Sequence, residues 1–226
     1  MSAKISTADK ILDSSRQLFN ARGYAATSLN DIASSVGISK GNLTYHYPTK
    51  RALAQRLIAS ARQAARERRL NLESGDVADD YVEHLLFAMD MTWNHRFLLR
   101  DRREFAEELG GPDSELTADF AELHTLIQRI SAAGLFRKGA VTDYAVLARS
   151  IWIVSRYWMD YLREFEGQQE VTWADQESGI RQHFAILLPC LTAAARKRFE
   201  AALTRAIEQQ QSSDPRPEPG TEATRA

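Results

Sequence analysis

The residues of this chain with the clearest chemistry are hydrogen-bond donors clustered between Thr27 and Lys50. The stretch reads TSLNDIASSVGISKGNLTYHYPTK, and its second half is rich in hydroxyl, amide, imidazole and ammonium groups. Such groups donate to phosphate oxygens and to base edges in a DNA groove. The stretch therefore predicts a surface that contacts DNA, if the backbone beneath it is ordered.

The backbone that presents these donors is predicted to be two short helices joined by a tight turn. Ser28 and Asp31 have the spacing of a helix-capping pair. Gly37 stands where the chain needs a left-handed residue to turn. Ser39 caps the second helix, residues 40–47, in which a single leucine faces inward. The same pattern alone also fits a surface helical hairpin in other all-α proteins, so the flanking sequence has to decide.

The flanking sequence resembles a known family. An amphipathic helix precedes the pattern and ends at Gly23, and another helix begins at Thr49. Between Ile11 and Leu53 the chain carries, in order, F-x-x-x-G-Y, T-S-x-x-D-I-A, V-G-I-S and L-x-Y-H-Y-x-x-K. This order resembles the DNA-binding domain of TetR-family (tetracycline-repressor-like) bacterial regulators. The resemblance implies an all-α fold, with an N-terminal three-helix helix-turn-helix DNA-binding domain and a C-terminal helical domain for ligand binding and dimerisation.

The resemblance also implies which residues meet the DNA. The family reads base edges from the start of the recognition helix, grips phosphates from its end, and touches the backbone from the preceding helix. The matching residues are, in that order, Lys40, Asn42 and Thr44; Tyr45, His46 and Lys50; and Thr27 and Ser28. The family usually has an aromatic residue where this chain has Thr44, so the contact there is either to a thymine methyl or absent. The expected partner is an inverted-repeat operator in double-stranded DNA, bound by a homodimer.

Charge and composition divide the chain into segments. Residues 1–72 hold 12 Lys and Arg against 4 Asp and Glu, a net charge of +8, and the remainder holds 17 against 26, a net charge of −9. A basic end on an acidic body is expected when only one end meets phosphate. We therefore expect four segments: a DNA-binding domain (1–50), a connecting helix (51–72), an effector-binding and dimerisation domain (73–208) and a disordered tail (209–226).

The body, as predicted from its apolar spacing, is helical and ends in two long helices. The first spans residues 146–165 and the second runs from residue 180 to 207, with a kink at Pro189. Both have apolar residues on more than one face, which favours pairing with a second copy of the chain. The alternative is that earlier helices bury both faces. An earlier helix is expected to break near residues 94–96.

Aromatic and cationic residues near that break are candidates for an effector site. A small, partly apolar effector with an acidic group could be held by aromatic rings and arginines. The candidate residues are Trp93, His95, Arg96, Phe97, Arg100, Trp152 and Trp158. Aromatic stripes on helices are also ordinary core, and such arginines also pair with neighbouring glutamates.

Other functional classes find little support in the sequence. The five histidines have no H-E-x-x-H or H-x-x-x-H spacing, the one cysteine excludes a cysteine metal cluster, and no glycine-rich phosphate loop follows a strand. We therefore expect no enzyme, no cofactor and no metal. We also expect a cytoplasmic protein that does not cross a membrane. The favoured function is a repressor released from its operator by an effector; the alternative is a ligand-independent helical module that binds DNA or docks to a protein.

Overall fold

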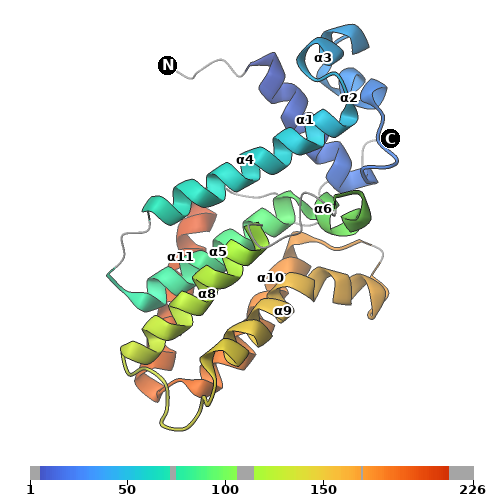
Figure 1. The fold of residues 1–226 in the computed structure, drawn as a ribbon. Helices are drawn as coiled ribbons and strands as arrows, with labels where there is room; N and C mark the ends of the chain where they lie inside the picture. The colour runs from blue at the N-terminus through green and yellow to red at the C-terminus, as the bar shows by residue number, and fades with distance from the viewer. Residues whose placement is uncertain (1–5, 72–74, 106–114, 169, 214–226) are drawn as a thin grey trace. The chain divides into compact units, whose positions relative to one another are not determined.

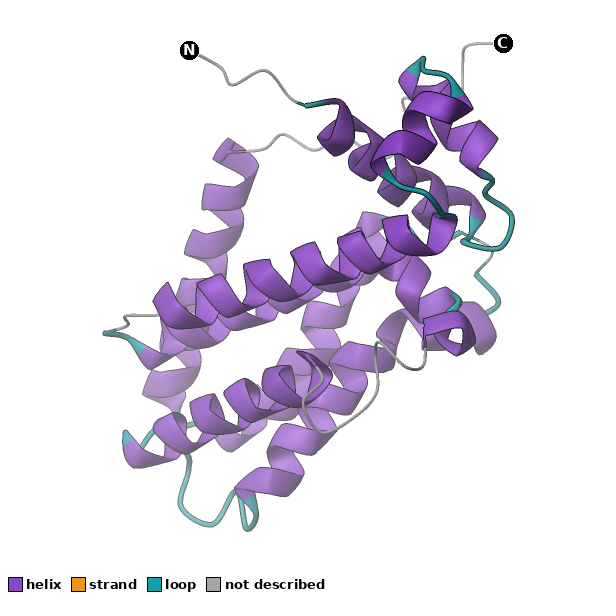
Figure 2. Cartoon of the chain, turned by 45° about the horizontal axis from the view of Figure 1, so that its top comes forward, coloured by secondary structure: helices purple, strands orange, loops and turns teal. Residues whose placement is uncertain are grey.

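The computed structural model describes residues 6–71, 75–105, 115–168 and 170–213 (Figure 1). These residues are helical almost throughout, and their one β pairing is an isolated bridge between Phe136 and Leu191 (Figure 2). The all-α fold expected from the sequence is confirmed.

The chain divides into two compact units, and the division differs from the segments expected from the sequence. Residues 1–72 and 91–118 form the N-terminal unit, and residues 73–90 and 119–226 form the body. The sequence had placed 91–118 in the body. They join the N-terminal unit because Phe97, Leu98 and Phe105 complete its apolar core.

The N-terminal unit consists of the helix-turn-helix and the helices packed on it. Its elements are α1 (Thr7–Arg22), α2 (Leu29–Val36), α3 (Lys40–His46), α4 (Lys50–Asn71), α6 (Arg96–Arg100) and the 3₁₀ helix η1 (Arg102–Phe105). Each helix of the hairpin contributes to the core through its apolar stripe, α2 through Ile32 and Ala33, and α3 through Leu43. Burial of these side chains in one core fixes how α3 lies against α2.

The hairpin forms as its sequence predicts. The Asp31 N–H donates to Ser28 Oγ at 3.2 Å and the Ser28 N–H donates to Asp31 Oδ2 at 2.8 Å, which makes a capping box. The Ser28 hydrogen bonds hold the pKa of Asp31 below its usual value, so this carboxylate is charged at neutral pH. Gly37 has φ 74°, and the Ile38 N–H returns to the Ala33 carbonyl at 3.0 Å. This Schellman closure ends α2 and sets the turn.

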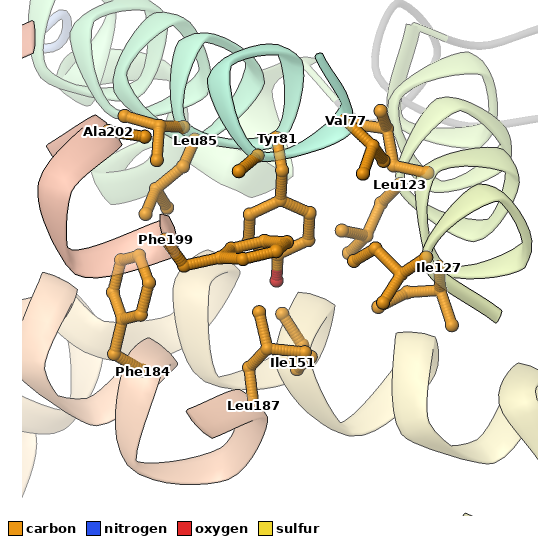
Figure 3. Close-up of a cluster of buried hydrophobic side chains, with 14 of the residues drawn as sticks. Val77, Tyr81, Leu85, Leu123, Ile127, Ile151, Phe184, Leu187, Phe199 and Ala202 are labelled. Carbon is orange, nitrogen blue, oxygen red and sulfur yellow. The ribbon is translucent and has the colours of Figure 1, made fainter. Parts of the chain in front are cut away.

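The body is a bundle of longer helices around one apolar core. Its elements are α5 (Val77–Asn94), α8 (Glu115–Ala132), α9 (Tyr144–Glu164), α10 (Trp173–Leu187), the 3₁₀ helix η2 (Leu188–Cys190) and α11 (Ala193–Ser213). The last turn of α5 and the first residues of α8 fall in the N-terminal unit. Figure 3 shows side chains from α5, α8, α9, α10 and α11 converging on Tyr81, which is fully buried.

Two expectations about the body need correction, and one is confirmed. Pro189 does not kink one long helix: α10 ends at Leu187 and α11 begins at Ala193, because proline removes a backbone donor and clashes with the preceding turn. Residues 209–213, expected to belong to the disordered tail, are part of α11, which continues to Ser213, and the rest of the expected tail, residues 214–226, lies outside the described residues. The break after α5 is confirmed at His95.

A polar line runs through the body core. The Tyr81 hydroxyl lies 2.5 Å from His183 Nε2, and Ser155 Oγ lies 2.8 Å from His183 Nδ1. Burial, with a smaller contribution from the charge of His84, lowers the pKa of His183 to about 3. The ring is therefore neutral at physiological pH, so one nitrogen donates and the other accepts. Both ring nitrogens are satisfied, which makes this line a structural element of the core.

Close packing of α9 on α10 depends on the absence of a side chain at Gly179. A Cβ there would lie 2.7 Å from Trp158 Cδ1. The Trp158 ring is held in place, because its Nε1 donates to the Asp175 carbonyl at 2.8 Å and its face stacks on Tyr161.

Replacing Gly179 by Ala is expected to destabilise the body. Overpacking costs about 1–3 kcal/mol, which exceeds the gain of about 1 kcal/mol that alanine brings to a helix interior. Urea unfolding followed by tryptophan fluorescence measures the difference. The control is Gly75→Ala, where a Cβ meets no atom within 4 Å and the free energy should change by less than about 0.5 kcal/mol. Equal free energies of unfolding for Gly179→Ala and Gly75→Ala would show that α9 and α10 accommodate the added methyl group without cost.

Candidate nucleic-acid interface

The outer face of α3 presents polar side chains over a single buried anchor. Leu43 is fully buried, whereas Lys40 and Asn42 are exposed and Tyr45 is 86% exposed. Ser39 caps the helix by accepting from the Asn42 N–H at 3.1 Å. An aromatic residue this exposed gains nothing from folding, so its position is suited to a partner surface.

The remaining α3 candidates are more constrained. Thr44 is half-buried and its hydroxyl donates to the Gly41 carbonyl at 3.1 Å, which leaves its methyl group and oxygen lone pair for a partner. His46 is half-buried and meets the Tyr45 ring edge-on at 5.4 Å. The Thr44 hydroxyl is therefore engaged with its own helix.

Thr27 and Ser28 differ in what they can offer to DNA. Thr27 is 1% exposed and its hydroxyl donates to the Gly23 carbonyl at 2.8 Å. Burial directs this hydroxyl into the fold, and a contact of Thr27 with the DNA backbone stays a prediction. Ser28 is exposed at the N-terminus of α2, and its N–H and its hydroxyl both donate to Asp31 Oδ2, at 2.8 and 2.5 Å.

Lys50, expected to grip a phosphate, is occupied by the protein backbone. Its Nζ donates to the carbonyls of Tyr24 at 2.8 Å and Thr27 at 3.0 Å, with Ala25 at 3.4 Å. The ammonium also lies 4.3 Å from the centre of the Tyr24 ring. An ammonium has three donors, and these three carbonyls use them all.

The predicted effector residues near the helix break make internal contacts in the N-terminal unit. Phe97 is fully buried against Phe19. Arg100 donates to the Phe19 carbonyl at 2.5 Å. Arg96 donates to the Trp93 carbonyl at 3.0 Å and lies over the Trp93 ring at 4.0 Å.

His95 in this group is also engaged, and the two other candidates belong to the body. His95 Nδ1 lies 3.0 Å from the Met91 carbonyl, and burial lowers the pKa of this imidazole. Trp152 and Trp158 have different partners: Trp152 Nε1 donates to Asp119 on α8, and Trp158 packs against α10. The structure thus divides the candidate effector residues between two units instead of gathering them.

Comparison with known proteins identifies the family. Residues 11–57 match the model of bacterial regulatory proteins of the tetR family, and residues 62–199 match the TetR model described as a bacterial transcriptional repressor. The chain belongs to the TetR family. It is therefore a helix-turn-helix transcriptional regulator, and α3 is the second helix of the helix-turn-helix.

Relatives of this TetR-family protein agree with that assignment. An uncharacterized HTH-type transcriptional regulator of Mycobacterium tuberculosis is 27% identical over 191 residues, which cover 84% of this chain and 89% of the relative. The biofilm operon icaADBC HTH-type negative transcriptional regulator IcaR of Staphylococcus aureus is 42% identical over 50 residues, 22% of this chain and 27% of that protein.

Solved structures share the fold. A TetR-family regulator from Marinobacter aquaeolei superposes with a TM-score of 0.70 at 23% identity, covering 89% of this chain and 98% of the other. A gamma-butyrolactone receptor superposes with a TM-score of 0.63 at 15% identity, covering 88% and 96%. Within the part of the chain that the structure describes, no helix is long and apolar enough to span a bilayer.

Proposed function

We propose that this TetR-family regulator is a repressor that binds an inverted-repeat operator as a homodimer and is released by a small-molecule effector. The observation that carries the DNA-binding part is the set of exposed donors Lys40, Asn42 and Tyr45 on α3, whose first turn is capped by Ser39. A rigid helix that presents an amide and an ammonium at its N-terminal turn fits base readout in a major groove.

Asn42 is proposed to read a base and Lys40 to meet guanine or a phosphate. Replacing Asn42 by Ala should change sequence preference at one position of each half-site by about 1–3 kcal/mol. Replacing Lys40 by Met should lower the salt dependence of binding, by a log–log slope of about 1 if it neutralises a phosphate. Selection from a random duplex pool, followed by titration at several salt concentrations, measures both. If the base preference of Asn42→Ala and the salt slope of Lys40→Met are both unchanged, α3 does not form the DNA interface.

The proposed dimer interface is an exposed apolar stripe on α9. Val146, Ile153, Tyr157 and Tyr161 are 51%, 46%, 37% and 41% exposed, and their spacing of seven, four and four residues places them on one face. The opposite face of α9 is the one that enters the body core, through Ala148 and others. An exposed apolar stripe of this length favours a partner helix, and a stable dimer buries on the order of 2,000 Å² in total.

Not every apolar residue in the two long segments predicted for dimerisation is suitable for this test. Ile151 and Leu191 lie in these segments, but they are 0% and 1% exposed and belong to the core. A charge at either position would unfold the body. Ile153 and Tyr157 are the suitable probes, because their side chains are exposed in one copy of the chain.

Replacing Ile153 by Glu should dissociate the dimer and weaken operator binding, because two copies of the charge would be buried against each other. Light scattering at micromolar concentration measures the mass. Ala121→Glu, at an exposed position on α8, is the control and should leave the dimer intact. A dimer in the Ile153→Glu variant, or a monomer in the unmodified protein, would contradict the proposed interface.

The effector is proposed to bind in the body beside a buried polar group. His84 is 4% exposed; its Nδ1 lies 3.0 Å from Glu122 Oε1 and its Nε2 lies 3.8 Å from Asp119 Oδ1. Trp152 Nε1 donates to the second oxygen of Asp119 at 2.9 Å. Polar groups in an apolar core cost free energy, and they persist mainly where function uses them. This group therefore supports Trp152 as the effector residue among the original candidates.

An effector that releases the DNA should weaken operator binding by about 5- to 150-fold, which corresponds to a coupling of about 1–3 kcal/mol. Thermal-shift screening of fatty acids, acyl conjugates and aromatic acids can find it. Replacing Trp152 by Phe should reduce the effect of any hit, because the variant lacks the indole N–H. Trp173→Phe serves as the control. A hit that acts equally on both variants would place its site elsewhere.

A further inference from the structure

The α1–α2 loop, residues 23–28, sets where the DNA-reading hairpin begins. Three charged side chains from outside the loop hold its backbone and the last turn of α1 before it. Arg100 donates to the Phe19 carbonyl at the end of α1, at 2.5 Å, and Asp101 Oδ2 accepts from the Tyr24 N–H at 2.8 Å. Lys50 donates to three carbonyls of the loop. We call Lys50, Arg100 and Asp101 the loop clamp.

The fit of the clamp to the loop is close. Gly23 has φ 98°, and a Cβ at this position would lie 3.4 Å from Arg100 Nη2, so the guanidinium packs directly against the glycine backbone. The Tyr24 N–H and carbonyl are both used, one by Asp101 and the other by Lys50. Backbone groups paired in this way leave the loop one arrangement, since each lost pair exposes a polar group without a partner.

Asn20 connects the clamp to the end of α5. Its Nδ2 donates to the Asn94 carbonyl at 2.8 Å, and its Oδ1 accepts from the Phe97 N–H at 3.0 Å. The Asn94 carbonyl is at the C-terminus of α5 and the Phe97 N–H is in the first turn of α6, where backbone groups lack partners within their own helix. α6 has no side-chain cap of its own. One buried amide on α1 therefore joins the two helices on either side of the break.

We propose that Lys50, Arg100 and Asp101 are positioning residues for DNA binding, and that Asn20 ties their position to the end of α5. This inference rests on the proposed reading of DNA by α3. The clamp holds the loop, the loop places α2, and α2 carries α3. Lys50 contributes to affinity through the backbone it holds and neutralises no phosphate. α5 has most of its length in the body and ends at Asn94 in the N-terminal unit, where Asn20 is hydrogen-bonded to it.

A matched pair of variants tests the clamp in the full-length protein, with a duplex selected by the unmodified protein. Asp101→Asn and Asp101→Ala both remove the charge, but only Asn keeps an oxygen that can accept from the Tyr24 N–H. Asp101→Ala should bind the duplex roughly 5- to 30-fold more weakly than Asp101→Asn, the factor expected for one or two kcal/mol. In Asp101→Ala, hydrogen exchange should be faster at the Tyr24 amide. Exchange in α10 should remain slow, because the body stays folded. Equal affinity of the two variants would overturn the proposal.

The salt dependence of binding tests Lys50 separately. Lys50→Met should weaken binding and leave the log–log salt slope unchanged, because no phosphate contact is lost. A slope reduced by about 1 would place Lys50 on a phosphate and overturn its positioning role. Asn42→Ala separates this inference from the proposed function. If Asn42→Ala alters sequence preference while the Asp101 pair binds equally, the clamp has failed; if Asn42→Ala has no effect, α3 is not the reading element and the inference loses its basis.

Discussion

Four aromatic rings close on one another in the N-terminal unit, and the DNA-reading hairpin depends on that contact. Phe19 of α1 meets Tyr24 of the loop at 5.2 Å, Tyr24 meets Phe105 at 4.9 Å, Phe105 meets Phe97 at 5.7 Å, and Phe97 returns to Phe19 at 5.3 Å. Such pairs contribute about 0.5–1.5 kcal/mol each beyond the burial of their area. Two rings come from the helix-turn-helix region and two from the segment after α5, so neither set is buried without the other.

The recognition helix cannot supply its own stability. α3 has seven residues, far fewer than the ~12–15 that an isolated helix needs in water, and Gly41 lowers its propensity further. Its order comes from the Ser39 cap, from Leu43 in the core, and from the turn closed by Gly37. A short helix with one apolar anchor leaves nearly all of its outer face free for polar groups. Stability and recognition are thus assigned to different residues of the hairpin.

The body has polar groups in its interior and apolar side chains on part of its surface, a distribution that suits a regulator. Its core is apolar around Tyr81, yet it contains a satisfied line through His183 and a second polar group around His84. The outer face of α9 is apolar where solvent would favour polar residues. An apolar surface on α9 and the buried His84 both cost free energy in a single copy. Each has a use if the surface meets a second copy and the interior meets a ligand.

Much of the fold could be predicted from the sequence, because the relevant interactions are local. The capping box of Ser28 and Asp31, the left-handed Gly37 and the break at His95 involve residues within about five positions of one another, and the structure confirms each of them. Apolar spacing identified most of the helices for the same reason. It failed at Pro189, where an apolar run concealed the end of one helix and the start of another.

The candidate site was only partly accessible to such reasoning. Residue type identified the donors of α3, but it could not show that Lys50, Thr27 and Arg100 donate to the protein's own backbone, since residue type does not reveal the partner of a charged or hydroxyl group. Asn20 and Asp101 had no signal at all. The amino-acid sequence by itself determined the helices, the turn and the row of donors. Tertiary structure alone decided which polar groups remain free for DNA, because partners such as Asp101 and Tyr24 are 77 residues apart and meet only in the folded chain.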